Sequence, residues 1–154
     1  MKVKLLAIYK EEEAWLAAGV KLYMERIRHY QSVDLVQIKP PKEAERSRQM
    51  AEEARLVLQA LQPGDTLVLL DEQGQPFSSV AFAGFLQKQL NSSAKTICFL
   101  IGGAYGFDDK LYARAQHRIS LSALTFPHQL ARLIFTEQLY RAFTILRNEK
   151  YHHA

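Results

Sequence analysis

Three closely spaced glycines follow an apolar segment in the second half of the chain. Ile97–Ile101 has the composition of a buried strand, and Gly102, Gly103 and Gly106 come after it. Glycine lets the main chain adopt positive φ, and it lets a ligand approach the main chain without a Cβ in the way. These residues could form a ligand-binding loop or, equally well, a plain left-handed turn, and composition leaves both interpretations open.

The spacing of these glycines differs from that of dinucleotide-binding proteins. Gly102, Gly103 and Gly106 give a GGxxG pattern, whereas the Rossmann fingerprint is GxGxxG with an acidic residue about twenty positions downstream. The candidate acidic residue, Asp71, lies upstream of the glycines. The sequence therefore disfavours a Rossmann-type dinucleotide site.

The remaining side chains suited to chemistry lie near the end of the chain. His128 could satisfy main-chain groups at the start of a helix, the role that we favour, or face the glycine loop. Glu137 and Arg141 are spaced i, i+4, which is typical of a helix salt bridge, although Arg141 could instead reach a phosphate. Tyr151 could stack on a base, and His152 carries an imidazole, the side chain that most often acts as a general base. The alternative for these two is a frayed terminus.

Apolar periodicity predicts alternating strands and helices. Strands are predicted at 2–9, 33–38, 66–70 and 97–101, with a possible short strand at 119–120, and helices at 11–30, 42–61, 78–90, 109–115 and 127–147. The first helix has acidic residues in its first turn, Ser78 or Ser79 caps the third, and residues 71–76 form a polar loop. This alternation predicts an α/β fold with a parallel sheet flanked by helices, whose ligands bind at the carboxyl ends of the strands.

The last predicted helix, 127–147, is apolar around most of its circumference. Its polar stripe is narrow and consists of Glu137, Arg141, Thr144 and Asn148. A helix of this kind must be buried on more than one side. Since we expect only one side to face the sheet of its own chain, the other side predicts packing against a second subunit, and hence a homodimer.

Composition bounds the class of protein. The chain of 154 residues predicts a single domain, 1–154, without a membrane span or a cleavable leader. Its lone cysteine, Cys98, falls within a predicted buried strand, which fits a reducing cytoplasm. The sequence has no cluster of Cys and His residues that could bind a metal, so we expect no metal site. The net charge of +4 favours a polyanionic partner only modestly, because an ordinary solvated surface explains it as well.

Four segments carry a resemblance to a known family. The chain resembles the RlmH family of SPOUT methyltransferases in the segments LIGGAYG and LSALTFPHQ, the helix EQLYRAF and the tail NEKYHH. The similarity extends back to the opening KVKLLAIYK. The resemblance implies a C-terminal deep trefoil knot and a homodimer. It also implies transfer of a methyl group from S-adenosyl-L-methionine to N3 of a pseudouridine in large-subunit ribosomal RNA, within the ribosome. Neither DNA nor a membrane is implied as a partner.

The resemblance also implies which residues form the site. The cofactor would be held by Leu70, Gly102, Gly103, Leu121, Ser122, Ala123, Leu124, Thr125 and Phe126, and the catalytic candidates are Tyr151, His152 and Arg141. The chain departs from some relatives in having Ala104–Tyr105 between its glycines, and its ending His153–Ala154 replaces a basic one. The rival hypotheses are a non-catalytic ribosome-binding protein of the same fold and an unrelated α/β phosphohydrolase.

Overall fold

A five-stranded parallel sheet forms the centre of the computed structural model, which describes residues 1–103 and 105–153. The strand order is β2-β1-β4-β3-β5, and every pairing between these strands is parallel. The strands are β1 (Lys2–Ile8), β2 (Val33–Ile38), β3 (Thr66–Pro76), β4 (Thr96–Ile101) and β5 (His117–Ser120), and the helices are α1 (Ala14–Ile27), α2 (Arg46–Ala60), α3 (Ser79–Leu90), α4 (Asp109–Arg114) and α5 (His128–Leu146). The predicted α/β fold is confirmed, and the deep trefoil knot stays a prediction.

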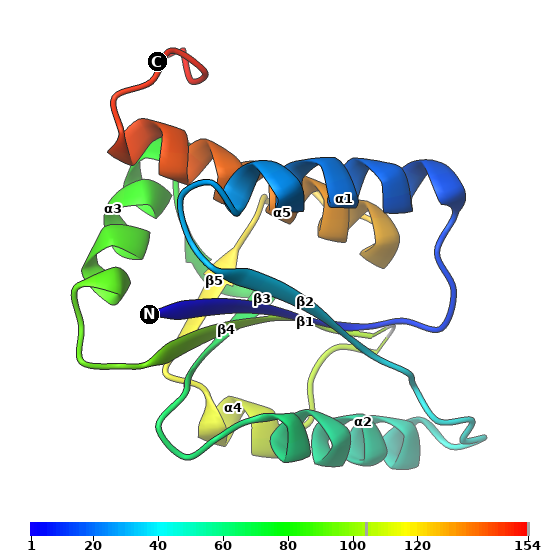
Figure 1. Cartoon of the computed structure of the whole chain (residues 1–154). Helices are drawn as coiled ribbons and strands as arrows, with labels where there is room; N and C mark the ends of the chain where they lie inside the picture. Colours follow the sequence, from blue (N-terminus) through cyan, green and yellow to red (C-terminus); the bar gives the residue numbers. More distant parts are fainter. Residues whose placement is uncertain (104, 154) are drawn as a thin grey trace.

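Helices cover both faces of the sheet. Figure 1 shows α1, α3 and α5 on one side and α2 and α4 on the other. Because successive side chains of a strand point to opposite faces, Leu5 of β1 and Phe99 of β4 pack toward the first group of helices, whereas Leu6 and Leu100 pack toward the second. All four side chains are fully buried, which explains why the central strands are continuously apolar.

Helix α5 is buried against two helices of its own chain as well as against the sheet. A Cβ built on Gly19 of α1 would lie 2.8 Å from Leu133, and the Ser79 hydroxyl of α3 donates to Gln138 over 2.7 Å. Thr144, predicted in the polar stripe, is fully buried. The assumption that only one side of this helix packs within the chain is therefore wrong. The predicted dimer stays a prediction.

The main error in the predicted elements concerns the end of β3. Residues 71–76 were expected to form a polar loop, but β3 runs on to Pro76 and pairs with a longer β5 than expected. The register shifts between Leu70 and Gln75, both of which pair with Ile119, so the intervening residues bulge out of the ladder. Main-chain pairing with β5 holds this stretch extended although its side chains are polar.

The helix ends differ from expectation by a few residues, with one consequence. Helix α1 begins at Ala14, so its first turn contains no acidic residue, and Glu12 instead pairs with Arg132 of α5. The predicted cap of α3 is confirmed, since the Ser78 hydroxyl accepts the N–H of Ala81. No helix in the part of the chain that the structure describes is long and apolar enough to cross a membrane.

Candidate functional site

A cavity of about 380 Å³ lies beside the glycine loop, at the carboxyl ends of β3 and β4. Eight of the nine residues predicted to hold a cofactor line it: Leu70, Gly102, Gly103, Leu121, Ser122, Leu124, Thr125 and Phe126. The ninth, Ala123, is exposed and does not line the cavity. Segments that are far apart in the sequence thus meet at one concave site, which we call the cofactor cavity. That they bind a cofactor stays a prediction.

Neither Gly102 nor Gly103 has room for a Cβ atom. Among the described residues only Gly106, at φ 83°, is a glycine with positive φ, so the plain left-handed turn is wrong for the other two. A Cβ on Gly102 would lie 2.7 Å from the ring of Phe107, and a Cβ on Gly103 would lie 2.9 Å from both carboxylate oxygens of Glu53. The absence of side chains therefore admits an aromatic ring and a carboxylate close to the loop.

The loop after β5 presents main-chain groups to the cofactor cavity. The hydroxyl of Ser120 donates to the carbonyl of Ser122, and the hydroxyl of Ser122 accepts the N–H of Leu124, each over 3.0 Å. Within residues 1–103 and 105–153, no main-chain hydrogen bond to another main-chain group involves Ser122–Phe126. Serine hydroxyls thus hold the loop while its other main-chain groups stay available. Apolar walls with such groups suit a flat ring with hydrogen-bonding edges.

The bulge of β3 contributes residues that sequence reasoning missed. Asp71, Glu72 and Gln73 line the cofactor cavity. The Tyr112 hydroxyl donates to Asp71 over 3.0 Å, and burial together with this bond raises the pKa of Tyr112. The signal was available, because polar residues at the carboxyl end of a buried parallel strand are typical of ligand sites.

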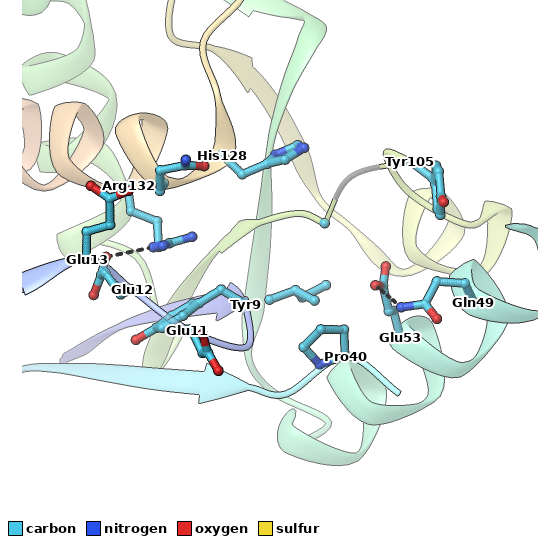
Figure 2. A pocket seen from close by; sticks show the side chains of 13 residues that line it. Tyr9, Glu11, Glu12, Glu13, Pro40, Gln49, Glu53, Tyr105, His128 and Arg132 are labelled. Carbon is cyan, nitrogen blue, oxygen red and sulfur yellow. Dashed lines mark hydrogen bonds and ion pairs between the residues drawn. The ribbon is translucent and has the colours of Figure 1, made fainter. Parts of the chain in front are cut away.

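A second cavity of about 420 Å³ adjoins the first and shares Gly103 and His128 with it. We call it the carboxylate cavity. Its other lining residues are Ile8, Tyr9, Glu11, Glu12, Glu13, Pro40, Gln49, Glu53, Tyr105, Gln129 and Arg132. Figure 2 shows Glu53 and Gln49 of α2 on one side and Arg132 and His128 of α5 on the other. His128, for which a structural role was favoured, thus lies at the junction of both cavities.

Two buried charged side chains face the carboxylate cavity, and neither was predicted. Glu53 is 4% exposed; the Gln49 amide donates to it over 2.9 Å, and burial raises its pKa against the opposing effects of Gln49 and His128. Arg132 is 3% exposed, its Nε donates to Glu12 over 3.0 Å, and its guanidinium lies 4.0 Å from the ring centre of Tyr9. No group of three or more His, Cys, Asp or Glu suited to a metal occurs among the described residues.

The three predicted catalytic residues come together beside the second half of α5. The guanidinium of Arg141 donates to Glu137 over 2.7 and 3.0 Å, and the Tyr151 hydroxyl donates to the same oxygen over 3.0 Å. Arg141 also lies 3.1 Å from Nδ1 of His152 and 4.8 Å from the ring centre of Tyr151. The tail as far as His152 is thus held against α5, so the frayed terminus is wrong for these residues. We call this group the tail cluster.

Comparison with known proteins decides the family. A family model described as a predicted SPOUT methyltransferase matches residues 1–152. Proteins named ribosomal RNA large subunit methyltransferase H from Christiangramia forsetii and Flavobacterium johnsoniae are 46% and 48% identical to this chain over 156 residues, with 99% of each chain covered. The chain belongs to the RlmH family of SPOUT methyltransferases. The resemblance seen in the sequence is thereby confirmed.

A solved structure shares the architecture of this RlmH-family chain. The crystal structure of a probable methyltransferase from Bordetella pertussis Tohama I superposes with a TM-score of 0.58 and covers 92% of this chain and 94% of its own. Its sequence identity is 13%, so the likeness supports the fold alone.

The cavities of this RlmH-family chain lie at the start of α5, and the tail cluster lies on its second half. The helix has 19 residues, which at 1.5 Å per residue span about 28 Å. His128 at its first residue borders both cavities, whereas Tyr151 and His152 follow the end of the helix and contact Glu137 and Arg141 of its second half. Burial and its contacts with Tyr23 and Glu137 raise the pKa of Tyr151, so the phenol stays protonated at neutral pH and suits hydrogen-bond donation.

Proposed function

We propose that this protein transfers a methyl group from S-adenosyl-L-methionine to N3 of a pseudouridine in large-subunit ribosomal RNA. It would act as a homodimer on the ribosome in the cytoplasm. The names of its full-length relatives support the reaction and the RNA. The observation that carries the cofactor is the convergence of eight predicted residues on one cavity beside the glycine loop.

The residues of the cofactor cavity fit S-adenosyl-L-methionine. Main-chain groups of Ser122–Phe126 would bind the edge of the adenine ring, between apolar walls such as Leu70 and Leu121. The carboxylates of Asp71 and Glu72 would accept hydrogen bonds from the ribose hydroxyls. The bound cofactor supplies an activated methyl group on a positively charged sulfur.

The tail cluster would act on the acceptor from the other subunit. Within one chain, Glu137 and Arg141 of the cluster lie about 14 and 20 Å along α5 from His128, and we infer that association of two chains brings the cluster to a cavity. Arg141 would bind a phosphate of the RNA, and His152 and the protonated Tyr151 would orient the base. Holding the base beside the cofactor removes much of the entropic cost of bringing two reactants together.

The proposal is tested by binding and by product analysis. Calorimetry should show that the protein binds S-adenosyl-L-methionine, and incubation with large-subunit particles that lack the modification should place one methyl group on N3 of a pseudouridine, as mass spectrometry reads it. Ribosome binding without methyl transfer would favour the non-catalytic alternative. No affinity for the cofactor would refute the proposal.

A further inference from the structure

The carboxylate cavity adjoins the place where the methyl donor would bind. Gly103 and His128 belong to the walls of both cavities, and the other walls of the carboxylate cavity come from the carboxyl ends of β1 and β2, from α2 and from α5. We propose that this cavity receives the acceptor base and that Glu53 takes up the proton of its N–H group. This inference rests on the proposed methyl transfer to a uracil-type base.

Glu53 differs from the other buried charge of the cavity in having no buried counter-ion. Arg132 is paired with Glu12, and the two side chains are 4% and 10% exposed. Among residues 1–103 and 105–153, no salt bridge reaches Glu53, and its side-chain hydrogen-bond partner is the neutral amide of Gln49. An uncompensated carboxylate costs stability when it is buried, so its presence in a cavity wall indicates a functional role.

The polar groups of the cavity match the edge of a uracil-type base. Such a base presents an N–H between two carbonyl oxygens, and an ionised carboxylate is an acceptor suited to that N–H. The guanidinium of Arg132 and the amide of Gln49 are donors suited to the carbonyls. The rings of Tyr9 and Tyr105 supply aromatic walls on which a base can stack.

The rim of the cavity argues against a phosphate as the occupant. Glu11, Glu12 and Glu13 line the cavity together with Glu53, whereas the facing cation, Arg132, is already paired with Glu12. A phosphate would be repelled by this excess of carboxylates, but a neutral base with N–H donors would not. The base therefore enters, while the RNA backbone stays outside.

The proton transfer is balanced within the site. The N–H bond of the base breaks, the proton passes to a carboxylate oxygen of Glu53, and the electron pair stays on the nitrogen, which becomes the nucleophile. The neutral carboxylic acid later releases the proton to water. Burial, which raises the pKa of Glu53, makes it a stronger base than an exposed carboxylate. The titratable and charged side chains that share its cavity are Tyr9, Glu11, Glu12, Glu13, Tyr105, His128 and Arg132.

Gly103 keeps this carboxylate at the junction of the two cavities. A Cβ at this position would lie 2.9 Å from both carboxylate oxygens and would push Glu53 away from the cofactor side. The glycine thus allows the proton acceptor to lie directly behind the loop that borders the methyl donor.

The test compares Glu53→Gln with Glu52→Gln in the full-length protein. Glu52 is the neighbouring residue of α2, pairs with Arg55 and lies outside both cavities, so it is a matched control. Calorimetry should give both variants the wild-type affinity for S-adenosyl-L-methionine. Single-turnover methyl transfer to large-subunit particles should fall about 100-fold or more in Glu53→Gln only, because a general base contributes about 10² to 10⁴ in rate. The loss of rate in Glu53→Gln should become smaller as pH rises, because the N–H group of the base then loses its proton to solvent.

A spectroscopic measurement tests whether the base binds beside Glu53, independently of the rate of methyl transfer. In protein labelled with ¹³C at glutamate carboxyls, pseudouridine nucleoside should shift the Glu53 signal and leave the Glu52 signal in place. The Glu53→Gln variant identifies the Glu53 signal. A nucleoside that shifts other glutamate signals but not that of Glu53 would overturn the subsite.

The remaining outcomes are distinguishable. An inactive wild type would refute the proposed function itself, whereas an active wild type matched by an equally fast Glu53→Gln would refute only the role of Glu53. If Glu53→Gln loses cofactor affinity by the same factor as rate, the cavity serves the cofactor and the proposal is wrong. If Glu53→Gln does not fold, Glu53→Asp is tested in its place. A pH–rate profile of Glu53→Asp with the same rates and shape as that of the wild type would refute the role of Glu53 as proton acceptor.

Discussion

Replacing Gly74 by alanine would place a methyl group against the main chain of β5. Of the seven glycines, Gly74 is the one whose missing Cβ faces main-chain atoms: it would lie 2.7 Å from the carbonyl carbon of Arg118 and from the nitrogen of Ile119. Ordinary carbon contacts are about 3.5–4.0 Å. Because both neighbours belong to a paired strand, no side-chain rotation relieves the clash, and β3 and β5 must separate by about 1 Å.

The expected cost follows from the cost of overpacking. Adding a methylene to a closely packed site costs about 1–3 kcal/mol. For a chain of this size, each kcal/mol lost from the free energy of unfolding lowers the melting temperature by about 2–4 °C. Gly74→Ala should therefore melt about 2–12 °C below the wild type. Since β5 leads into the loop that lines the cofactor cavity, the affinity for S-adenosyl-L-methionine should fall as well.

The same substitution at Gly84 provides a control of opposite sign. Gly84 is exposed in α3, and a Cβ there would meet nothing within 4 Å. Alanine in a helix interior is favoured over glycine by about 0.5–1 kcal/mol, so Gly84→Ala should melt about 1–4 °C higher. Both melting temperatures are compared at one protein concentration, because association shifts them. A Gly74→Ala protein that melts at or above the wild type would refute the reasoning.

Three further predictions follow from the tail, the surface of α5 and the buried carboxylate. A chain that ends at Asn148 should keep its affinity for S-adenosyl-L-methionine and lose methyl transfer, because the cofactor cavity stays intact while Tyr151 and His152 are removed. Unchanged single-turnover rates would contradict this. Ile145→Asp should yield monomers in sedimentation if α5 forms the dimer seam, whereas Phe143, which stacks on Tyr30 within the core, would test only the fold. Glu53→Gln should raise the free energy of unfolding at neutral pH, and this gain should shrink as pH falls. The folded-state pKa of Glu53 lies above its unfolded value, so the folded state binds more protons and the wild type loses stability as pH rises through that window. Urea unfolding at several pH values checks this, and parallel pH dependences would argue against it.

The fold could be predicted wherever periodicity and burial agree. The strand at 33–38 was predicted with its observed bounds, and the predicted cap of α3 is present, because local chemistry decides both. The end of β3 could not be predicted, because its polar residues are held extended by pairing between Gln75 and Ile119. That pairing joins segments more than forty residues apart, and no local pattern reports it.

The site was predictable in its loops and not in its buried charges. The segments implied by the resemblance line one cavity, but Glu53 is a charged residue within the predicted helix 42–61, and its residue type does not indicate burial. Its burial depends on the missing side chain of Gly103, fifty residues later. One local signal existed: Glu53 precedes Val57 by four residues, so the two share a face of the helix, and the apolar Val57 is fully buried.

The length of α5 links the two halves of the proposed reaction. One chain carries the cavities at the start of this helix and the tail cluster on its second half, where Glu137 and Arg141 lie about 14 and 20 Å along the axis from His128. A two-fold axis across the exposed side of α5 would set two copies of the helix antiparallel, so that the start of each lies beside the end of the other. Each cavity would then face the tail cluster of the partner, and the dimer would hold two equivalent sites. The separation between the two groups thus favours this assembly, and a monomer would hold both halves without bringing them together.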